Sequence, residues 1–199
     1  KLLLSKNYKV IGIERFNSQN QKWRHLFLNI KNQIIYETSD LNDELAISKI
    51  IKKYKPSEFY NLAAHSFVKS SFDQALSVID TNAKSVVRIL ELLKEFTPKT
   101  KFYQASTSEM YGEFETNLLN EKSRFNPRSP YAVAKLFAHG ITKNYRESYG
   151  MFCCSGILFN HESPLRGEEF VTRKITKQLC EISLGQRKFI ELGNIYSKR

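Results

Sequence analysis

The chain has 199 residues, 41% of them hydrophobic and 26% charged, and this length and composition predict a folded domain with a sizeable core and exclude a disordered chain. Lys and Arg outnumber Asp and Glu by 31 to 20, which gives a net charge of +11, but the basic residues are spread along the chain and form no nucleic-acid-binding motif. No apolar run is long enough to cross a bilayer and no secretory signal pattern is present, so we expect no nucleic-acid partner and no membrane partner.

The first elements predict the start of a parallel sheet. Residues 1–7 are typical of the end of a helix, and residues 9–14 predict a short strand that ends in a carboxylate. In a Rossmann sheet, a carboxylate at the end of the second strand binds the adenosine ribose hydroxyls, whereas a nearby Arg accepts a 2′-phosphate. Glu14 and Arg15 offer both groups, and they also fit an ordinary exposed turn.

Strand and helix patterns alternate in the next part of the chain. The pattern predicts a strand, a helix and a buried strand with its exit at residues 34–37, 42–54 and 59–65. Asp40 is placed to cap the helix. The small side chains of Ala63 and Ala64 allow a flat cofactor to approach the backbone, although close packing also explains them. Residues 66–72 predict a loop, and a long helix follows over residues 75–96.

The most informative stretch joins a strand to a helix. The strand-like run 101–105 leads into Ser106-Thr107-Ser108-Glu109. After a polar connection, Ser129 and Pro130 suit the start of a helix that runs to about Tyr149. Tyr131 and Lys135 are four residues apart and therefore share a helix face, where the ammonium is expected to lower the tyrosine pKa and favour proton transfer.

The helix from Tyr131 and the strand after it complete an α/β pattern. The apolar residues of this helix are expected to face the core: Val133, Leu136, Phe137, Ile141 and Tyr145. A strand is predicted over residues 151–159, so the alternation indicates a doubly wound parallel sheet, a Rossmann fold. The odd number of cysteines, two of them adjacent in this strand, favours buried free thiols in a reducing, cytoplasmic compartment. No Cys or His spacing suggests a metal site.

Tyr-x-x-x-Lys after a strand that ends in Ser and Thr resembles the extended, sugar-nucleotide branch of the short-chain dehydrogenase/reductase superfamily. Three longer stretches resemble the GDP-mannose 4,6-dehydratase family in particular. They are Gln-Ala-Ser-Thr-Ser-Glu-Met-Tyr-Gly at 104–112, Pro-Arg-Ser-Pro-Tyr at 127–131 and Gly-Ile-Leu-Phe-Asn-His-Glu-Ser-Pro at 156–164. Their order along the chain strengthens the resemblance, which extends over essentially all 199 residues.

The resemblance implies a reaction and four catalytic residues. Tyr131 would remove the C4 hydroxyl proton of GDP-mannose, Thr107 would orient that hydroxyl, and Lys135 would lower the tyrosine pKa and hold the nicotinamide ribose. Glu109 would take the C5 proton and help to expel the C6 hydroxyl as water. The expected product is GDP-4-keto-6-deoxymannose, a precursor in GDP-fucose and deoxyhexose synthesis.

The resemblance also implies the binding residues. NADP is the expected cofactor, with NAD as the alternative, because Arg15 matches one of the family's two consecutive arginines whereas Phe16 departs from the other. The implied cofactor-binding residues are Arg15, Asp40, Leu41, Leu62, Ala63, Ala64, Ser66, Tyr131, Lys135 and His161. The implied substrate-binding residues are Ser108, Asn160, Glu162, Arg166 and Lys174. Leu165 replaces an arginine that the family carries beside Arg166.

The expected organisation is an NADP-binding Rossmann domain over residues 1–160 and the beginning of a sugar-nucleotide-binding domain over residues 161–199. Since no Gly-rich phosphate loop precedes the strand at 9–14, we expect that loop and the first strand to lie upstream of Lys1, and further substrate contacts to lie downstream. The family implies a homodimer or homotetramer. Two alternatives stay open: another extended nucleotide-sugar dehydratase, reductase or epimerase, and a non-catalytic truncated copy.

Overall fold

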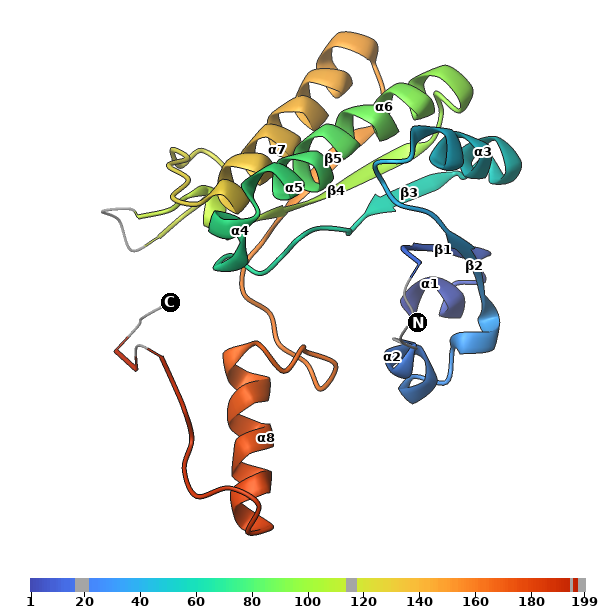
Figure 1. Cartoon of the computed structure of the whole chain (residues 1–199). Helices are drawn as coiled ribbons and strands as arrows, with labels where there is room; N and C mark the ends of the chain where they lie inside the picture. Colours follow the sequence, from blue (N-terminus) through green and yellow to red (C-terminus); the bar gives the residue numbers. More distant parts are fainter. Residues whose placement is uncertain (17–21, 114–117, 194, 197–199) are drawn as a thin grey trace. The chain divides into compact units, whose positions relative to one another are not determined.

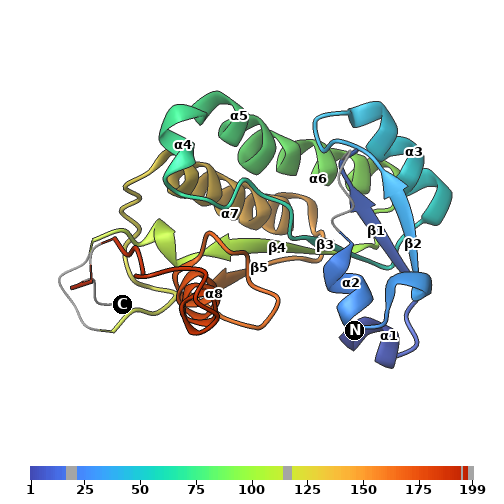
Figure 2. The ribbon, with the colours of Figure 1, turned by 60° about the horizontal axis from the view of Figure 1, so that its bottom comes forward.

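The computed structural model describes residues 1–16, 22–113, 118–193, 195 and 196. The chain divides into two compact units, Lys1–Phe159 (unit 1) and Asn160–Arg199 (unit 2). Figures 1 and 2 show the strands in unit 1 and helix α8 (Val171–Ser183) in unit 2. No helix in the described part of the chain has the length and apolar character that a membrane span requires.

Unit 1 contains parallel sheets. β1 (Val10–Glu14) pairs with β2 (Ile34–Thr38), and a second sheet has the order β3 (Glu58–Asn61), β4 (Lys101–Thr107), β5 (Cys153–Leu158). Each of these pairs is parallel, which confirms the predicted α/β class. In a doubly wound sheet the first strand pairs with both the second and the fourth. The second and fourth strands of that fold correspond here to β1 and β3. Among the described residues no strand pairs with both β1 and β3, so the single predicted sheet is observed as two.

The larger core of unit 1 joins three helices to the sheet. The helices are α3 (Glu44–Tyr54), α6 (Ser85–Phe96) and α7 (Pro130–Tyr149), and α6 and α7 lie along β4 and β5 in Figure 1. Burying one large apolar side chain stabilises the fold by about 1.5–3 kcal/mol, so this cluster fixes α7 against the sheet. Its buried members are Ile47, Ile51, Val86, Ile89, Leu90, Leu92, Leu93, Phe102, Ala138, Tyr145, Met151 and Cys153.

The start of α3 corrects one expectation. Its cap is Asp43, whose carboxylate accepts a hydrogen bond from the Ala46 backbone N–H at 2.9 Å. Asp40 lies one turn too early to reach the helix, and its carboxylate accepts instead from the Asn42 N–H at 2.8 Å. The short helical segments near β1 and β2 are α1 (Leu2–Ser5), α2 (Trp23–Phe27) and η1 (Lys31–Gln33).

The predicted helix over residues 75–96 is interrupted. It consists of α5 (Ala75–Ile79), a π-helical turn η2 (Asp80–Lys84) and α6. The preceding segment, predicted as a loop, contains the short helix α4 (Ser70–Asp73). Because π turns widen a helix locally and are frequent at functional sites, η2 marks a region to inspect for binding contacts.

Helix α7 begins and ends as predicted, and the prediction of its buried face holds in part. Tyr145 is buried and Ile141 packs against the larger core, as expected. The Ser129 hydroxyl accepts from the Ala132 N–H at 3.1 Å, and Gly150 ends the helix with φ of 65°. Val133 and Phe137, expected in the core, are 53% and 49% exposed. The buried residues are Tyr131, Ala132, Ala134, Lys135, Ala138, Thr142 and Tyr145. The face turned toward β4 is therefore small and polar rather than aliphatic.

Candidate active site

The four residues expected to be catalytic lie together where β4 ends. Thr107 is the last residue of β4, and its hydroxyl accepts a hydrogen bond from the backbone N–H of Glu109 at 3.2 Å. Glu109 lies in the 3-10 turn η3 (Ser108–Met110). On α7, the Lys135 Nζ lies 6.0 Å from the ring centroid of Tyr131. Since α7 packs on both β4 and η3, the fold joins the two groups that the sequence singled out.

Tyr131 has an electrostatic environment that differs from the sequence expectation. Its side chain is buried, and burial raises its pKa above the ordinary value. A hydrogen bond with the Thr107 side chain acts in the opposite direction, whereas the charge of Glu109 raises the tyrosine pKa further. The expected net lowering of the tyrosine pKa is therefore not observed, because burial raises the pKa more than the Thr107 hydrogen bond lowers it.

The Lys135 ammonium is held by the end of β4. The side chain is 3% exposed, and its Nζ donates to the Ala105 carbonyl oxygen at 2.9 Å. Burial lowers its pKa to about 8. The same carbonyl accepts from the Gln104 amide at 3.0 Å, and Gln104 in turn accepts from the Asn61 amide at 2.8 Å. A chain of buried hydrogen bonds thus connects β3, β4 and α7.

The segment after β3 is also brought to Tyr131. Tyr131 belongs to a second core cluster with Val78, Ala83 and Ala134, against which Ala64 and Val68 pack. The other residues implied in cofactor binding here, Leu62, Ala63 and Ser66, are exposed. The segment after β3 thus joins accessible residues to Ala64, which packs against the cluster that contains Tyr131.

Asn82 holds this segment in place and was not singled out as functional from the sequence. It lies in η2, is 1% exposed, and makes two hydrogen bonds with the backbone of His65: its Oδ1 accepts from the N–H at 2.9 Å and its Nδ2 donates to the carbonyl at 3.1 Å. A buried amide within an otherwise apolar helix stripe was the available signal. Asn61 and Gln104, polar residues in buried strands, gave the same kind of signal.

The turn that carries Glu109 is fastened by the chain that follows it. The Asn126 N–H donates to the Met110 carbonyl at 2.9 Å, and the Tyr111 hydroxyl donates to the Asn120 carbonyl at 2.8 Å. Gly112 has φ of 63°, and a Cβ at this position would lie 1.9 Å from the Asn126 oxygen. Glycine is therefore required for the close approach that holds η3 in place.

Charged and aromatic side chains meet at the end of β1. Glu14 forms an ion pair with Lys22 at 2.8 Å, and the Lys22 Nζ lies 4.0 Å from the ring centroid of Tyr36. The predicted residue Arg15 follows directly and is exposed. Asp40 is exposed as well, whereas Leu41 packs against the larger core. Lys22 could not be recognised from the sequence pattern, because it lies eight positions beyond Glu14 in an irregular segment.

The remaining candidates, Asn160, His161, Glu162, Arg166 and Lys174, belong to unit 2. Asn160 and His161 are exposed. Glu162 pairs with Arg166 at 3.4 Å and accepts from the Thr172 hydroxyl at 2.5 Å. The Arg166 guanidinium carbon lies 3.6 Å from the ring centroid of Phe170. Glu162 and Arg166 are thus held by local contacts around the start of α8.

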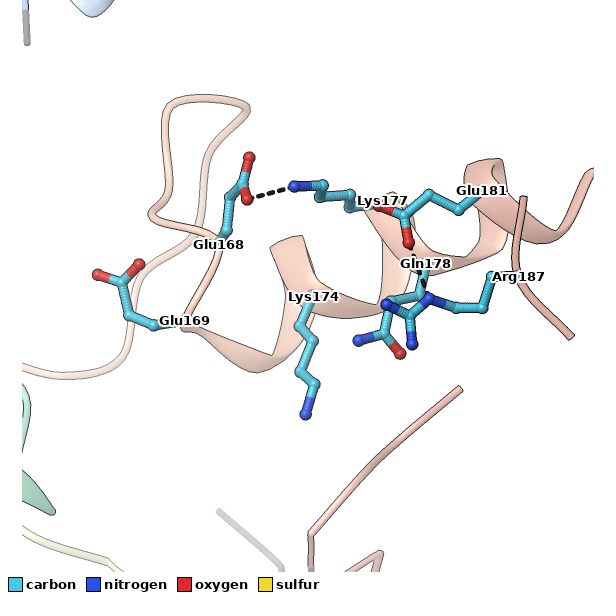
Figure 3. A pocket seen from close by; sticks show the side chains of 7 residues that line it. All are labelled: Glu168, Glu169, Lys174, Lys177, Gln178, Glu181 and Arg187. Atoms are coloured by element: carbon cyan, nitrogen blue, oxygen red, sulfur yellow. Dashed lines mark hydrogen bonds and ion pairs between the residues drawn. The ribbon is translucent and has the colours of Figure 1, made fainter. Parts of the chain in front are cut away.

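Lys174 lines a charged pocket within unit 2. Figure 3 shows its side chain extending away from two ion pairs, Lys177 with Glu168 and Arg187 with Glu181. The lining residues are Glu168, Glu169, Lys174, Lys177, Gln178, Glu181 and Arg187. Mixed charges suit a polar, ionised ligand more than an apolar one. Across the described ranges of both units, no group of His, Cys, Asp and Glu side chains is arranged to hold a metal ion.

Comparison with known proteins gives a consistent family. A family model described as GDP-mannose 4,6 dehydratase matches residues 1–199. The chain is 46% identical over 210 residues to GDP-mannose 4,6 dehydratase 2 of Caenorhabditis elegans, covering 100% of this chain and 54% of that protein. It is 46% identical to GDP-mannose 4,6-dehydratase of Vibrio cholerae, covering 99% and 55%. The chain therefore spans about half the length of the curated relatives it matches.

A solved structure supports the fold. The dTDP-glucose 4,6-dehydratase of Streptomyces venezuelae, solved with NAD and TYD bound, superposes with a TM-score of 0.77. The match covers 90% of this chain and 56% of that one, at 20% sequence identity. Similarity at this level of identity concerns the fold, and it places the two parallel sheets of unit 1 within the Rossmann architecture expected from the sequence.

Proposed function

The chain belongs to the GDP-mannose 4,6-dehydratase family, and from this premise we propose that the protein carrying it converts GDP-mannose to GDP-4-keto-6-deoxymannose with loss of water. The observation that supports this reaction most directly is the position of Glu109 beside Thr107 and Tyr131. Elimination of water needs a base for the C5 hydrogen in addition to the group that handles the C4 hydroxyl. A simple reductase or epimerase does not need that second base.

In the proposed reaction, Tyr131 removes the proton of the C4 hydroxyl and Thr107 holds that hydroxyl by a hydrogen bond. Lys135, whose Nζ lies near the ring of Tyr131, stabilises the developing phenolate by its positive charge. Once C4 is a ketone, the C5 hydrogen is acidified, and Glu109 removes it while assisting the departure of the C6 hydroxyl. Ser108 is proposed to contact the sugar from the same turn.

A bound NADP⁺ would supply the hydride chemistry, as acceptor of the C4 hydride and, once reduced to NADPH, as the donor that returns it to C6. The residues of unit 1 fit a dinucleotide, because Ala64 packs against the cluster of Tyr131, accessible residues flank Ala64, and a cation–carboxylate pair lies at the end of β1. We propose that Leu62, Ala63, Ala64 and Ser66 follow the dinucleotide, with Arg15, Asp40 and Leu41 at its adenosine end. Lys135 and Tyr131 hold the nicotinamide ribose, and His161 is assigned to the same ligand from unit 2.

The cofactor is proposed to be NADP rather than NAD because Glu14 is already paired with Lys22. That pair occupies the carboxylate that would otherwise accept the ribose hydroxyls, and it adds a cation, beside Arg15, for a 2′-phosphate. Replacing Lys22 by Met is expected to weaken NADP binding about tenfold relative to NAD. Titrating both cofactors against intrinsic fluorescence measures the ratio, and Lys31→Met is the control. An unchanged ratio would contradict the assignment.

We assign Asn160, Glu162, Arg166 and Lys174 to the sugar nucleotide, whose diphosphate suits the cations at the start of α8. The protein is proposed to act as a homodimer or homotetramer in the cytoplasm. A size-exclusion measurement with light scattering tests the assembly. The positions Asn194, Lys198 and Arg199, which also match the family, lie outside the described residues.

The function is tested with the longest natural open reading frame that contains this chain. The purified protein is incubated with NADP⁺ and GDP-mannose, and the products are examined by mass spectrometry for loss of one water. We expect loss with GDP-mannose and none with dTDP-glucose, UDP-glucose or GDP-glucose. Loss with another of these substrates would move the assignment to a related dehydratase. Binding of both ligands without any product would favour a non-catalytic protein.

A further inference from the structure

Helix α7 turns a third polar side chain toward β4. His139 follows Tyr131 and Lys135 at the same four-residue spacing, so the three share one helix face. Its Nδ1 lies 3.1 Å from the Oγ of Ser106, a buried residue that is 2% exposed. Successive residues of the strand end thus meet successive turns of the helix: Ala105 meets Lys135, and Ser106 meets His139.

His139 also contacts the chain that fastens η3. The ring of Phe125 lies edge-on to the imidazole, with centroids 5.5 Å apart and planes at 69°. Phe125 packs in turn on Tyr111, with centroids 5.0 Å apart. Tyr111 directly follows the turn that carries Glu109. The imidazole of His139 therefore contacts Ser106 at the end of β4 and Phe125, which packs on Tyr111 next to η3.

The protonation state of His139 suits a fixed hydrogen bond. Burial lowers its pKa, and the positive charges of Arg146 and Lys143 on the same helix lower it further, so the ring is neutral near pH 7. A neutral imidazole forms a hydrogen bond with the Ser106 hydroxyl in either direction, according to its tautomer. An apolar side chain of similar size would pack on Phe125 but leave the buried hydroxyl of Ser106 without this partner.

We propose that His139 is a positioning residue for the elimination step. Through its contacts with Ser106 and Phe125, His139 fixes Thr107 and Glu109 relative to the sugar. This inference rests on the proposed dehydratase function. Ser106 is adjacent to Thr107, and η3 begins one residue later, so a shift of the strand end moves both groups. A displacement of about 1 Å is enough to reduce turnover strongly when a base must meet a particular hydrogen.

The test compares His139→Leu, His139→Asn, Ser106→Ala and the double variant His139→Leu/Ser106→Ala in the full natural protein. Asn places an amide near the position of Nδ1 and retains the hydrogen bond. The exposed residue Asn144 on the same helix supplies the control, Asn144→Leu. Each variant is measured for kcat and KM of water loss from GDP-mannose, for NADP⁺ affinity, and for exchange of the C5 hydrogen in D₂O.

We expect His139→Leu and Ser106→Ala each to lower kcat and C5 exchange about tenfold, with KM and NADP⁺ affinity within twofold of the unaltered protein. The double variant should be no worse than either single one, because both changes remove the same interaction. His139→Asn should restore kcat to within threefold. If His139→Leu fails to fold, Ser106→Ala and His139→Asn still carry the prediction.

Two outcomes separate this inference from the function on which it rests. No water loss from the unaltered protein would overturn the proposed function and this role of His139 together. Water loss from the unaltered protein, with Ser106→Ala and His139→Asn either both fully active or equally impaired, would overturn the positioning role alone. A parallel fall in thermal stability, NADP⁺ affinity and kcat would show a purely structural residue and overturn it as well.

Discussion

The polar groups of unit 1 and those of unit 2 are held in different ways. At the end of β4, Thr107, Lys135 and the amides beneath them are buried and bonded to partners on other elements. Around α8, the charged groups form ion pairs over short sequence separations between side chains that are exposed or partly exposed, such as Lys177 with Glu168. Buried bonds fix geometry strongly, whereas exposed pairs contribute little to stability and adapt to a ligand. The difference suits chemistry in unit 1 and ligand contact in unit 2.

The largest effect on turnover is expected at Glu109, the proposed base for the C5 hydrogen. Glu109→Gln keeps the size of the side chain but removes the base, so the rate of water loss should fall 10²–10⁴-fold, the usual contribution of a general base. NADP⁺ affinity should stay within twofold. Mass spectrometry of the product measures the rate. Glu113→Gln, which alters an exposed carboxylate paired with Arg128 at 2.8 Å, should leave the rate unchanged; a Glu109→Gln enzyme of undiminished rate would remove Glu109 from the mechanism.

The next effect concerns the amide that holds the segment after β3. Asn82→Ala leaves the N–H and carbonyl of His65 without their partner and should lower the free energy of unfolding by about 2 kcal/mol. The binding of NADP⁺ should weaken as well, because Ala64 and its neighbours lose their support. Urea unfolding and cofactor titration measure the two effects. Asn144→Ala, an exposed change on α7, should alter stability by less than about 0.5 kcal/mol.

Lys135 predicts a dependence of stability on pH. Its pKa, lowered from 10.5 to about 8 by burial, means that the folded protein releases a proton above pH 8 that the unfolded chain retains. The free energy of unfolding should therefore rise by about 1 kcal/mol from pH 8 to pH 9 through this group. Above pH 9 the buried Cys153 thiol opposes this rise in the free energy of unfolding. Burial raises the pKa of that thiol to about 11, so the folded protein retains a proton that the unfolded chain releases.

The pH effect is isolated by comparing variants in urea unfolding at pH 8 and 9. Lys135→Met should lack the rise that the unaltered protein shows. Lys143→Met changes an exposed lysine of the same helix and should retain the rise. Equal slopes for Lys135→Met and the unaltered protein would show that Lys135 does not lose its proton in this range.

The smallest effect on stability is expected in unit 2. Glu162→Gln and Glu168→Gln each remove one exposed ion pair and should change the free energy of unfolding by less than about 0.5 kcal/mol. Glu162→Gln should nevertheless raise the KM for GDP-mannose severalfold if the residue contacts the sugar nucleotide. A loss of stability above 1 kcal/mol would show that unit 2 is as firmly fixed as unit 1, and would remove the contrast between them.

Helix α7 shows which structural features the sequence pattern predicts and which it does not. The ends of α7 followed from Ser129, Pro130 and Gly150, since capping and glycine conformation are local effects. The buried face followed only in part: Tyr145 and Ile141 pack in the core as expected. Val133 and Phe137 suggested an apolar core face, but α7 buries Lys135 and Thr142, because each of these has a partner elsewhere in the fold or in the preceding turn. Periodicity in hydrophobicity is a poor guide when the buried face carries the active groups.

The sequence by itself determined the alternation of strands and helices, the parallel α/β class and the shared helix face of Tyr131 and Lys135, because periodicity, capping and residue spacing are properties of short segments. The resemblance to the family added Thr107 and Glu109 to this pair. Only the tertiary structure decided that Asp43 rather than Asp40 caps α3 and that burial raises the pKa of Tyr131. It also decided that Asn82 binds the backbone of His65, that Lys22 pairs with Glu14 and that His139 meets Ser106. These facts depend on which side chains from distant segments share a low-dielectric interior, and no local pattern encodes that.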